Sequence, residues 1–193
     1  MIAAQLGCTE IVNKLCTMGE HIAGVTRRDL KGRDALMFAS MHGFDTCVQI
    51  LLTFAPPITL NWIVQHTDIS PQQAAELTPP KALLMNRDAE GNTALHHAAA
   101  FGHLLVVRTL LAAGADPYKN NVYHWLAVHY SISKEAEAYM VELVLDMELR
   151  SRIAKEKRAA FAESHVERDM GHGLGIKDVD EMRGKSLRIV QDD

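Results

Sequence analysis

The side chains best suited to chemistry are five histidines between residues 96 and 129: His96, His97, His103, His124 and His129. Imidazole binds zinc and acts as a general base near neutral pH, so such a group could serve a metal-dependent enzyme. No two of them have the His-Glu-x-x-His spacing, and no serine or cysteine stands in a nucleophile motif. We therefore expect no catalytic residue, no metal and no cofactor, and the metal-dependent enzyme stays an alternative.

The three cysteines are the other reactive group. Cys8, Cys16 and Cys47 are odd in number and fall in or beside predicted helices, which favours reduced thiols over disulfides. None of them has zinc-finger spacing. The histidines therefore have to be explained by the elements around them.

Residues 88–120 predict a tight turn followed by two short helices. Gly91 gives the turn its backbone freedom. Gly102 ends the first helix and Gly114 ends the second. The apolar residues of the second helix recur at helical spacing: Val106, Val107, Leu110 and Leu111.

This segment resembles one complete repeat of the ankyrin-repeat family, in which about 33 residues form a β-turn and two helices. Its Thr-Ala-Leu-His run at 93–96 stands in place of the family's Thr-Pro-Leu-His, with Ala94 in the usual proline position. The resemblance implies that Thr93 caps the first helix and that His96 and His129 tie neighbouring turns together by hydrogen bonds. It also explains His103, which follows the glycine between the helices.

One repeat cannot bury its own apolar face, so neighbouring copies are required. Equivalent patterns begin 59 residues earlier, a further 36 residues earlier, and 33 residues later. We expect an all-α ankyrin-repeat solenoid of helix-turn-helix repeats with β-turn tips and a C-terminal helical extension. The predicted repeat domain, 1–148, comprises a partial repeat 1–28, a repeat 29–60, an insertion 61–87, a repeat 88–120 and a degenerate repeat 121–148.

Three parts of this pattern are irregular. The first repeat lacks its turn, as expected for a piece of a longer protein. The segment 61–87 is proline-rich and predicts only one helix, at 70–77, which favours an insertion over the alternative of a decayed repeat. In the fourth repeat Glu135 replaces the glycine between the helices, so Ser131 or Ser133 is expected to cap the second helix.

The last quarter of the sequence leaves the repeat pattern. A stretch without proline or glycine predicts one helix from 134 to about 168, in which 149–170 forms a charged extension. Its basic residues form either a solvated face or a docking surface for an acidic partner. Residues 171–193 are predicted to be a flexible tail.

Composition limits the partners. The net charge of −4 and a pI near 6.2 give no general attraction to nucleic acid or to an anionic membrane. No stretch approaches the roughly 18 apolar residues of a membrane span, and no signal peptide begins the sequence. We expect a protein partner, no small-molecule substrate, and a cytoplasmic location with the nucleus as the alternative.

The resemblance implies that a partner binds the concave face formed by turn tips and first-helix ends. The mapped partner-binding residues are Arg28, Lys31, Arg33, Met41, His42, Glu90, Asn92, Phe101, Tyr123, Trp125 and Lys134, together with Leu30 and Val122 at the turn tips. Large side chains such as Phe101 and Trp125 are frequent interface anchors, and the alternative is that Trp125 or Tyr123 packs under the insertion or the terminal helix. Arg28, Lys31 and Arg33 indicate either a contact with an acidic partner or a charged turn that faces solvent.

A narrower resemblance concerns residues 123–149. This stretch is similar to the last repeat of the ankyrin-repeat accessory subunit of fungal TOR complex two. The similarity implies a peripheral, non-catalytic subunit of a kinase assembly, as an alternative to a scaffold or adaptor.

Overall fold

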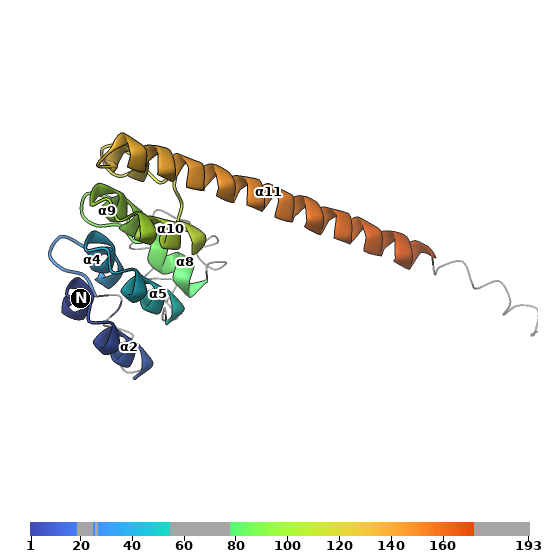
Figure 1. The fold of residues 1–193 in the computed structure, drawn as a ribbon. Helices are drawn as coiled ribbons and strands as arrows, with labels where there is room; N and C mark the ends of the chain where they lie inside the picture. Colours follow the sequence, from blue (N-terminus) through green and yellow to red (C-terminus); the bar gives the residue numbers. More distant parts are fainter. Residues whose placement is uncertain (19–24, 26, 55–77, 172–193) are drawn as a thin grey trace, which may run out of the picture. The chain divides into compact units, whose positions relative to one another are not determined.

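The computed structural model describes residues 1–18, 25, 27–54 and 78–171, and all regular secondary structure in these ranges is helical. The chain forms two units, Met1–Met147 and Glu148–Asp193. The helix pairs of the first unit appear in Figure 1 as successive layers. The predicted helix at 70–77, most of the predicted insertion and the predicted tail from 172 lie outside the described residues.

Three helix pairs form the first three repeats. They are α1 (Ile2–Gln5) with α2 (Thr9–Thr17), α4 (Ala35–Met41) with α5 (Asp45–Thr53), and α9 (Ala94–Ala100) with α10 (Leu104–Ala112). The short helix α8 (Pro79–Leu84) precedes the third repeat and packs against α5. The all-α ankyrin-type architecture expected from the sequence is therefore present.

The fourth repeat differs from the other three. A 3-10 helix, η1 (Ala127–Tyr130), takes the place of the first helix, and α11 (Lys134–Gly171) takes the place of the second. The backbone N–H of Ala136 donates to Ser133 Oγ at 3.2 Å, so Ser133 is the one of the two predicted caps that acts at the start of α11. Residues 149–159 of α11 are all exposed.

The repeats stack helix on helix. α1 packs against α4, α4 against α9, and α9 against η1, while α2 packs against α5 and α5 against α10. The second and third repeats are thus direct neighbours, although 59 residues separate their equivalent positions. Between the layers lies one continuous apolar core, whose fully buried members include Leu36, Val48, Leu51, Leu95, Val106, Val107 and Leu110.

The same close contact joins each repeat to the next. A glycine follows the first helix of each of the first three repeats, and a side chain from the following repeat lies against it. A Cβ atom would approach the facing side chain to 2.5 Å at Gly7, 2.5 Å at Gly43 and 3.0 Å at Gly102. We call these contacts the stacking pairs: Gly7 with Phe44, Gly43 with His103, and Gly102 with Ile132.

The turn tips are also built alike. In the third repeat Asp88 Oδ1 accepts hydrogen bonds from the backbone N–H groups of Glu90 and Asn92, at 2.9 and 2.8 Å. Asp29 and Asn121 accept the equivalent pairs of bonds in their own turns. Aspartate and asparagine favour such turns because their short side chains reach the backbone two residues on.

Backbone hydrogen bonds join neighbouring turns. The N–H of Ala89 donates to the carbonyl of Lys31 at 2.8 Å, and the N–H of Val122 donates to the carbonyl of Glu90 at 3.0 Å. We call these bonds the turn ladder. It fixes the second, third and fourth repeats in register at their tips.

His124 is expected to be a strained position in its turn. Its φ is 60°, whereas Gly32 and Gly91 occupy the equivalent positions with φ of 76°. Since a left-handed backbone costs a side-chain-bearing residue about 1 kcal/mol, His124→Gly should raise the free energy of unfolding by about that amount. Urea denaturation measures the change. Glycine at the neighbouring Tyr123 is the control and should not stabilise the chain, and a lower midpoint for His124→Gly would contradict the prediction.

The described helices are not membrane spans. Within the described ranges, none combines the length and apolar composition that a bilayer crossing needs.

Candidate functional site

The histidines serve mainly as structural hydrogen-bonding groups. His96 Nδ1 accepts from the backbone N–H of Thr93 at 3.2 Å, which leaves the proton on Nε2 to donate to the carbonyl of Trp125 at 3.1 Å. His96 therefore ties the third repeat to the turn of the fourth, as predicted. Burial lowers the pKa of His96, in keeping with a neutral ring that uses both nitrogens.

The neighbouring histidines are engaged as well. His97 Nε2 lies 2.9 Å from Asp88 Oδ2, and His103 Nε2 lies 3.0 Å from the carbonyl of Met41. Burial by itself would raise the pKa of Asp88, but the bond from His97 and the backbone N–H donors outweigh it and lower that pKa. His129 accepts from the N–H of Leu126 in its own repeat. In the part of the chain that the structure describes, no three His, Cys, Asp or Glu residues are grouped to hold a metal.

Stability is expected to fall in mild acid because of His96. Its folded pKa lies below the reference value of 6.5, so the unfolded chain binds the proton more readily. The contribution of the neutral ring is complete above the unfolded value of 6.5 and is lost as the pH falls from there through the lower folded pKa. We expect the free energy of unfolding to fall on acidification, and His96→Asn to lack this part of the pH dependence. Urea denaturation at several pH values measures it, and an unchanged slope in the variant would contradict the assignment.

The exposed side chains of the turn tips and the first-helix ends form the candidate contact face. Three large ones belong to adjacent repeats: Phe101 is 49% exposed, Tyr123 is 59% exposed and Trp125 is 52% exposed. The remaining exposed members of the predicted set are Lys31, His42, Glu90 and Lys134.

The two largest rings of this face are held in place by neighbours. The ring of Phe101 stacks on that of His103, with centroids 6.5 Å apart and planes 13° apart. His103 is itself bonded to the second repeat through Met41. Trp125 meets Tyr130 edge to face, with centroids 5.5 Å apart. Ordered aromatic side chains lose little conformational entropy when they bind, which suits an interface anchor.

Asn92 is not accessible, in contrast to its predicted place on the contact face. It is 6% exposed, and its Oδ1 accepts from the amide of Asn121 at 2.9 Å. Its own amide group lies near the carboxylates of Asp88 and Glu90. The burial arises because the turn of the fourth repeat covers it.

Two of the predicted basic residues are also turned toward the protein. Arg28 is half-buried, and its guanidinium donates to the carbonyl of Arg87 at 2.7 Å. Arg33 forms an ion pair with Asp29 at 2.6 Å and lies 4.6 Å from the centre of the Phe38 ring. Met41 is half-buried beside them, and only Lys31 of the three basic residues is exposed.

The structure adds one apolar residue that sequence reasoning missed. Ile132 is 67% exposed and packs beside Gly102, next to Phe101 in the chain. At the turn tips Leu30 is fully exposed and Val122 is 55% exposed, at equivalent positions of two turns. Ile132 takes the place of Phe44 and His103 against the glycine of the preceding repeat, but the repeat register puts Ala136 at that position, so the spacing gave no signal for Ile132.

This chain is similar to known proteins over most of its length. A family model described as ankyrin repeats (3 copies) matches residues 1–121 and 60–156. The probable E3 ubiquitin-protein ligase XBOS32 of Oryza sativa subsp. japonica is 35% identical over 121 residues, which cover 60% of this chain and 24% of that protein. The chain thus matches about a quarter of the length of this relative.

Proposed function

Because the chain belongs to the ankyrin-repeat family, we propose that it is a non-catalytic scaffold or adaptor that binds a protein partner. Ankyrin repeats are typically interaction modules. The proposed binding surface is the contact face, with Phe101 and Trp125 as its anchors. The partner is a protein because the face offers scattered side chains on successive repeats rather than one enclosed site.

The observation that supports this proposal most directly is the exposure of ordered aromatic rings. Phe101 and Trp125 each leave about half of the side chain in solvent although the core needs neither. Large aromatic residues at protein interfaces contribute far more to binding than their number suggests. Lys31, Glu90 and Lys134 of the predicted set are also exposed and supply charged groups of the kind found in the polar rim of an interface.

The double variant Phe101→Ala, Trp125→Ala tests the proposal. We expect it to fold as the original chain does, since both side chains are half-exposed, and to lose binding by a factor of about 100 or more. The tagged chain is purified with its partner from native cells, and the affinity of the purified pair is then measured for each variant.

The matched control is Leu105→Ala, Arg108→Ala. Both residues are exposed on α10, away from the contact face. The control should bind normally. Equal loss in both double variants, or no loss in either, would count against the contact face.

A second candidate function is a peripheral subunit of a larger assembly, such as a TOR-type kinase complex. It is supported by an apolar pocket beside the first turns of α11, lined in part by Leu126, Met140, Val141 and Leu145. Val141 and Leu145 are 46% and 59% exposed. Under this alternative Val141→Asp, Leu145→Asp would release the partner, and Phe101→Ala, Trp125→Ala would not.

The ubiquitin-ligase activity named for the rice relative is not extended to this chain. The match covers 24% of that protein, so its activity could reside elsewhere in its sequence.

A further inference from the structure

The exposed charges of α11 change sign along its length. In 134–147, the stretch that belongs to the first unit, the exposed charges are mostly acidic: Glu135, Glu137, Glu142 and Asp146, beside Lys134. In 148–159 the exposed charges are mostly basic: Arg150, Arg152, Lys155, Lys157 and Arg158, beside Glu156. The helix therefore offers an acidic stretch followed by a basic stretch.

Each stretch also exposes two apolar side chains. They are Val141 and Leu145 in the acidic stretch, and Leu149 and Ile153 in the basic stretch. The two members of each pair are four residues apart, so they lie on the same side of the helix. Glu142 stands next to Val141, and Arg152 stands next to Ile153. Each stretch thus combines an apolar patch with a charge, and the two charges are opposite.

The two stretches can meet beyond neighbouring turns only if they belong to different molecules. α11 (Lys134–Gly171) is one unbroken helix, and its sequence has no proline or glycine before Gly171. Such a helix does not fold back on itself. In an antiparallel pair of copies, the acidic stretch of one lies against the basic stretch of the other, whereas a parallel pair would bring like charges together.

We propose that α11 pairs with α11 of a second copy of this chain, antiparallel, about a two-fold axis beside Met147. Leu145 of one copy then shares a layer with Leu149 of the other, and Val141 shares a layer with Ile153. This register sets all four apolar residues against apolar residues. It also brings Glu142 level with Arg152 of the other copy. The two-fold axis makes each contact occur twice, so an ion pair stands at both ends of the apolar patch.

This interface is separate from the contact face, because Phe101 and Trp125 do not belong to α11. It covers Val141 and Leu145, the residues that the second candidate function gives to a different partner. Four apolar side chains from each copy make a small contact, and exposed ion pairs add little to it. We therefore expect a dimer that dissociates in the range of about 1–100 μM.

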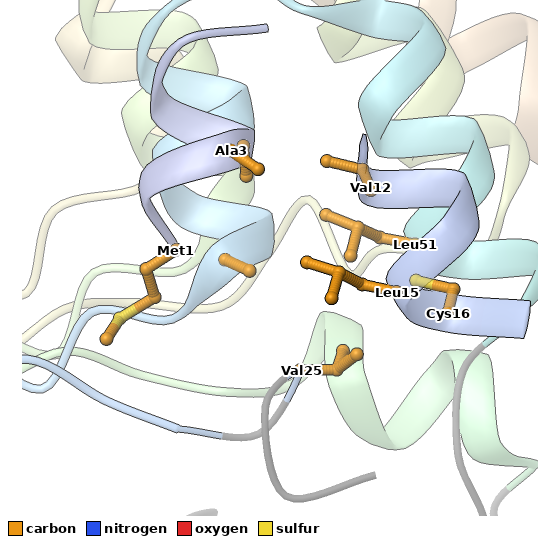
Figure 2. A pocket seen from close by; sticks show the side chains of 9 residues that line it. Met1, Ala3, Val12, Leu15, Cys16, Val25 and Leu51 are labelled. Atoms are coloured by element: carbon orange, nitrogen blue, oxygen red, sulfur yellow. The ribbon is translucent and has the colours of Figure 1, made fainter. Parts of the chain in front are cut away.

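Another exposed apolar surface lies on the first helix pair and provides a comparison. Figure 2 shows the cavity there: Ala3 on α1 faces Val12, Leu15 and Cys16 on α2, and Met1 lies before α1. The cavity measures about 120 Å³. The side chains that line it are all uncharged, so they lack the charge complementarity of the two stretches of α11.

Sedimentation equilibrium of the full chain at several concentrations tests the proposal. We expect Glu142→Arg and Arg152→Glu each to weaken the dimer by a factor of about 10 or more, because each sets like charges together at two symmetric places. The double variant Glu142→Arg, Arg152→Glu should restore the dimer, since its ion pairs are only reversed. The matched control Arg158→Glu should leave association within about a factor of two, because this exposed residue lies on another side of the helix.

Two further comparisons locate the interface on the molecule. Leu145→Asp should weaken the dimer, whereas Leu15→Asp, at a residue of the first helix pair that is 41% exposed, should not. The variant Phe101→Ala, Trp125→Ala should form the dimer as the original chain does. Loss of the protein partner and loss of the dimer are therefore separate results.

Any of four results would overturn the proposal. The original chain would remain a monomer at about 1 mM. The single charge reversals would leave the dimer unchanged, as a parallel pair predicts. The double reversal would fail to restore it. Finally, Leu15→Asp would dissociate the dimer and Leu145→Asp would not, which would place the contact between copies on the first helix pair.

Discussion

Replacing Gly91 by alanine is expected to lower the free energy of unfolding by about 3 kcal/mol, through backbone strain and the loss of a turn hydrogen bond. Its φ is 76°, and a Cβ atom would lie 2.9 Å from the backbone nitrogen of Val122. That nitrogen donates to the carbonyl of Glu90 in the turn ladder, so it has no room to retreat without breaking the bond. Urea denaturation of the full chain measures the loss.

Gly114→Ala is the control for this prediction. Gly114 also has a positive φ, 96°, but the nearest atom to its Cβ position is Lys81 Cε at 3.8 Å. Its substitution should cost only the backbone strain, about 1–2 kcal/mol. Equal losses at the two positions would show that the turn ladder adds nothing to stability.

Asn86→Ala is expected to lower the free energy of unfolding by a similar amount, about 2–4 kcal/mol at neutral pH. Asp34 is 0% exposed and caps α4 by accepting from the N–H of Met37 at 2.9 Å. Its second carboxylate oxygen accepts from the amide of Asn86 at 2.7 Å. The alanine variant removes that donor and leaves a buried carboxylate with fewer partners.

The cost of Asn86→Ala should shrink in acid. Burial raises the pKa of Asp34, and the bond from Asn86 opposes this rise. A carboxyl with a raised folded pKa contributes its stability below the unfolded value of 3.8 and loses it as the pH rises through the folded value. Without Asn86 this loss becomes larger, so the difference between variant and original chain is greatest near neutrality.

Urea denaturation at neutral and acidic pH measures that difference. Asn120→Ala, at an exposed asparagine, is the matched control and should show a small change that does not depend on pH. A deficit for Asn86→Ala that grows in acid would contradict the buried-carboxylate account.

The sequence was sufficient wherever local chemistry decides the structure. The helix ends at Gly102 and Gly114 follow from glycine at fixed spacing, and the resemblance to ankyrin repeats implied the cap at Thr93 and the bond from His96 to the next turn. The same spacing identified the neighbouring repeats. The ankyrin-type fold was therefore predictable from sequence alone.

The sequence was not sufficient where contacts between repeats determine the position of a side chain. Asn92 has the sequence position of an exposed turn residue, but Asn121 of the next turn covers it. Arg28 is turned inward by the carbonyl of Arg87, which lies 59 residues further along the chain. The 3-10 geometry of η1 was likewise not indicated by the residues of that segment. Each of these features depends on a neighbour that spacing within one repeat does not describe.

The stacking pairs make each repeat specific for the repeat that follows it in the chain. Each pair takes its glycine from one repeat and its larger side chain from the next, and the three partners, Phe44, His103 and Ile132, differ in shape and polarity. Exchanging the second and third repeats would set Phe44 against Gly102, where Ile132 now packs. It would also remove the hydrogen bond between His103 and the carbonyl of Met41. The repeats are thus similar modules that are not interchangeable, and shuffled versions of the chain would require their junction residues to be exchanged together.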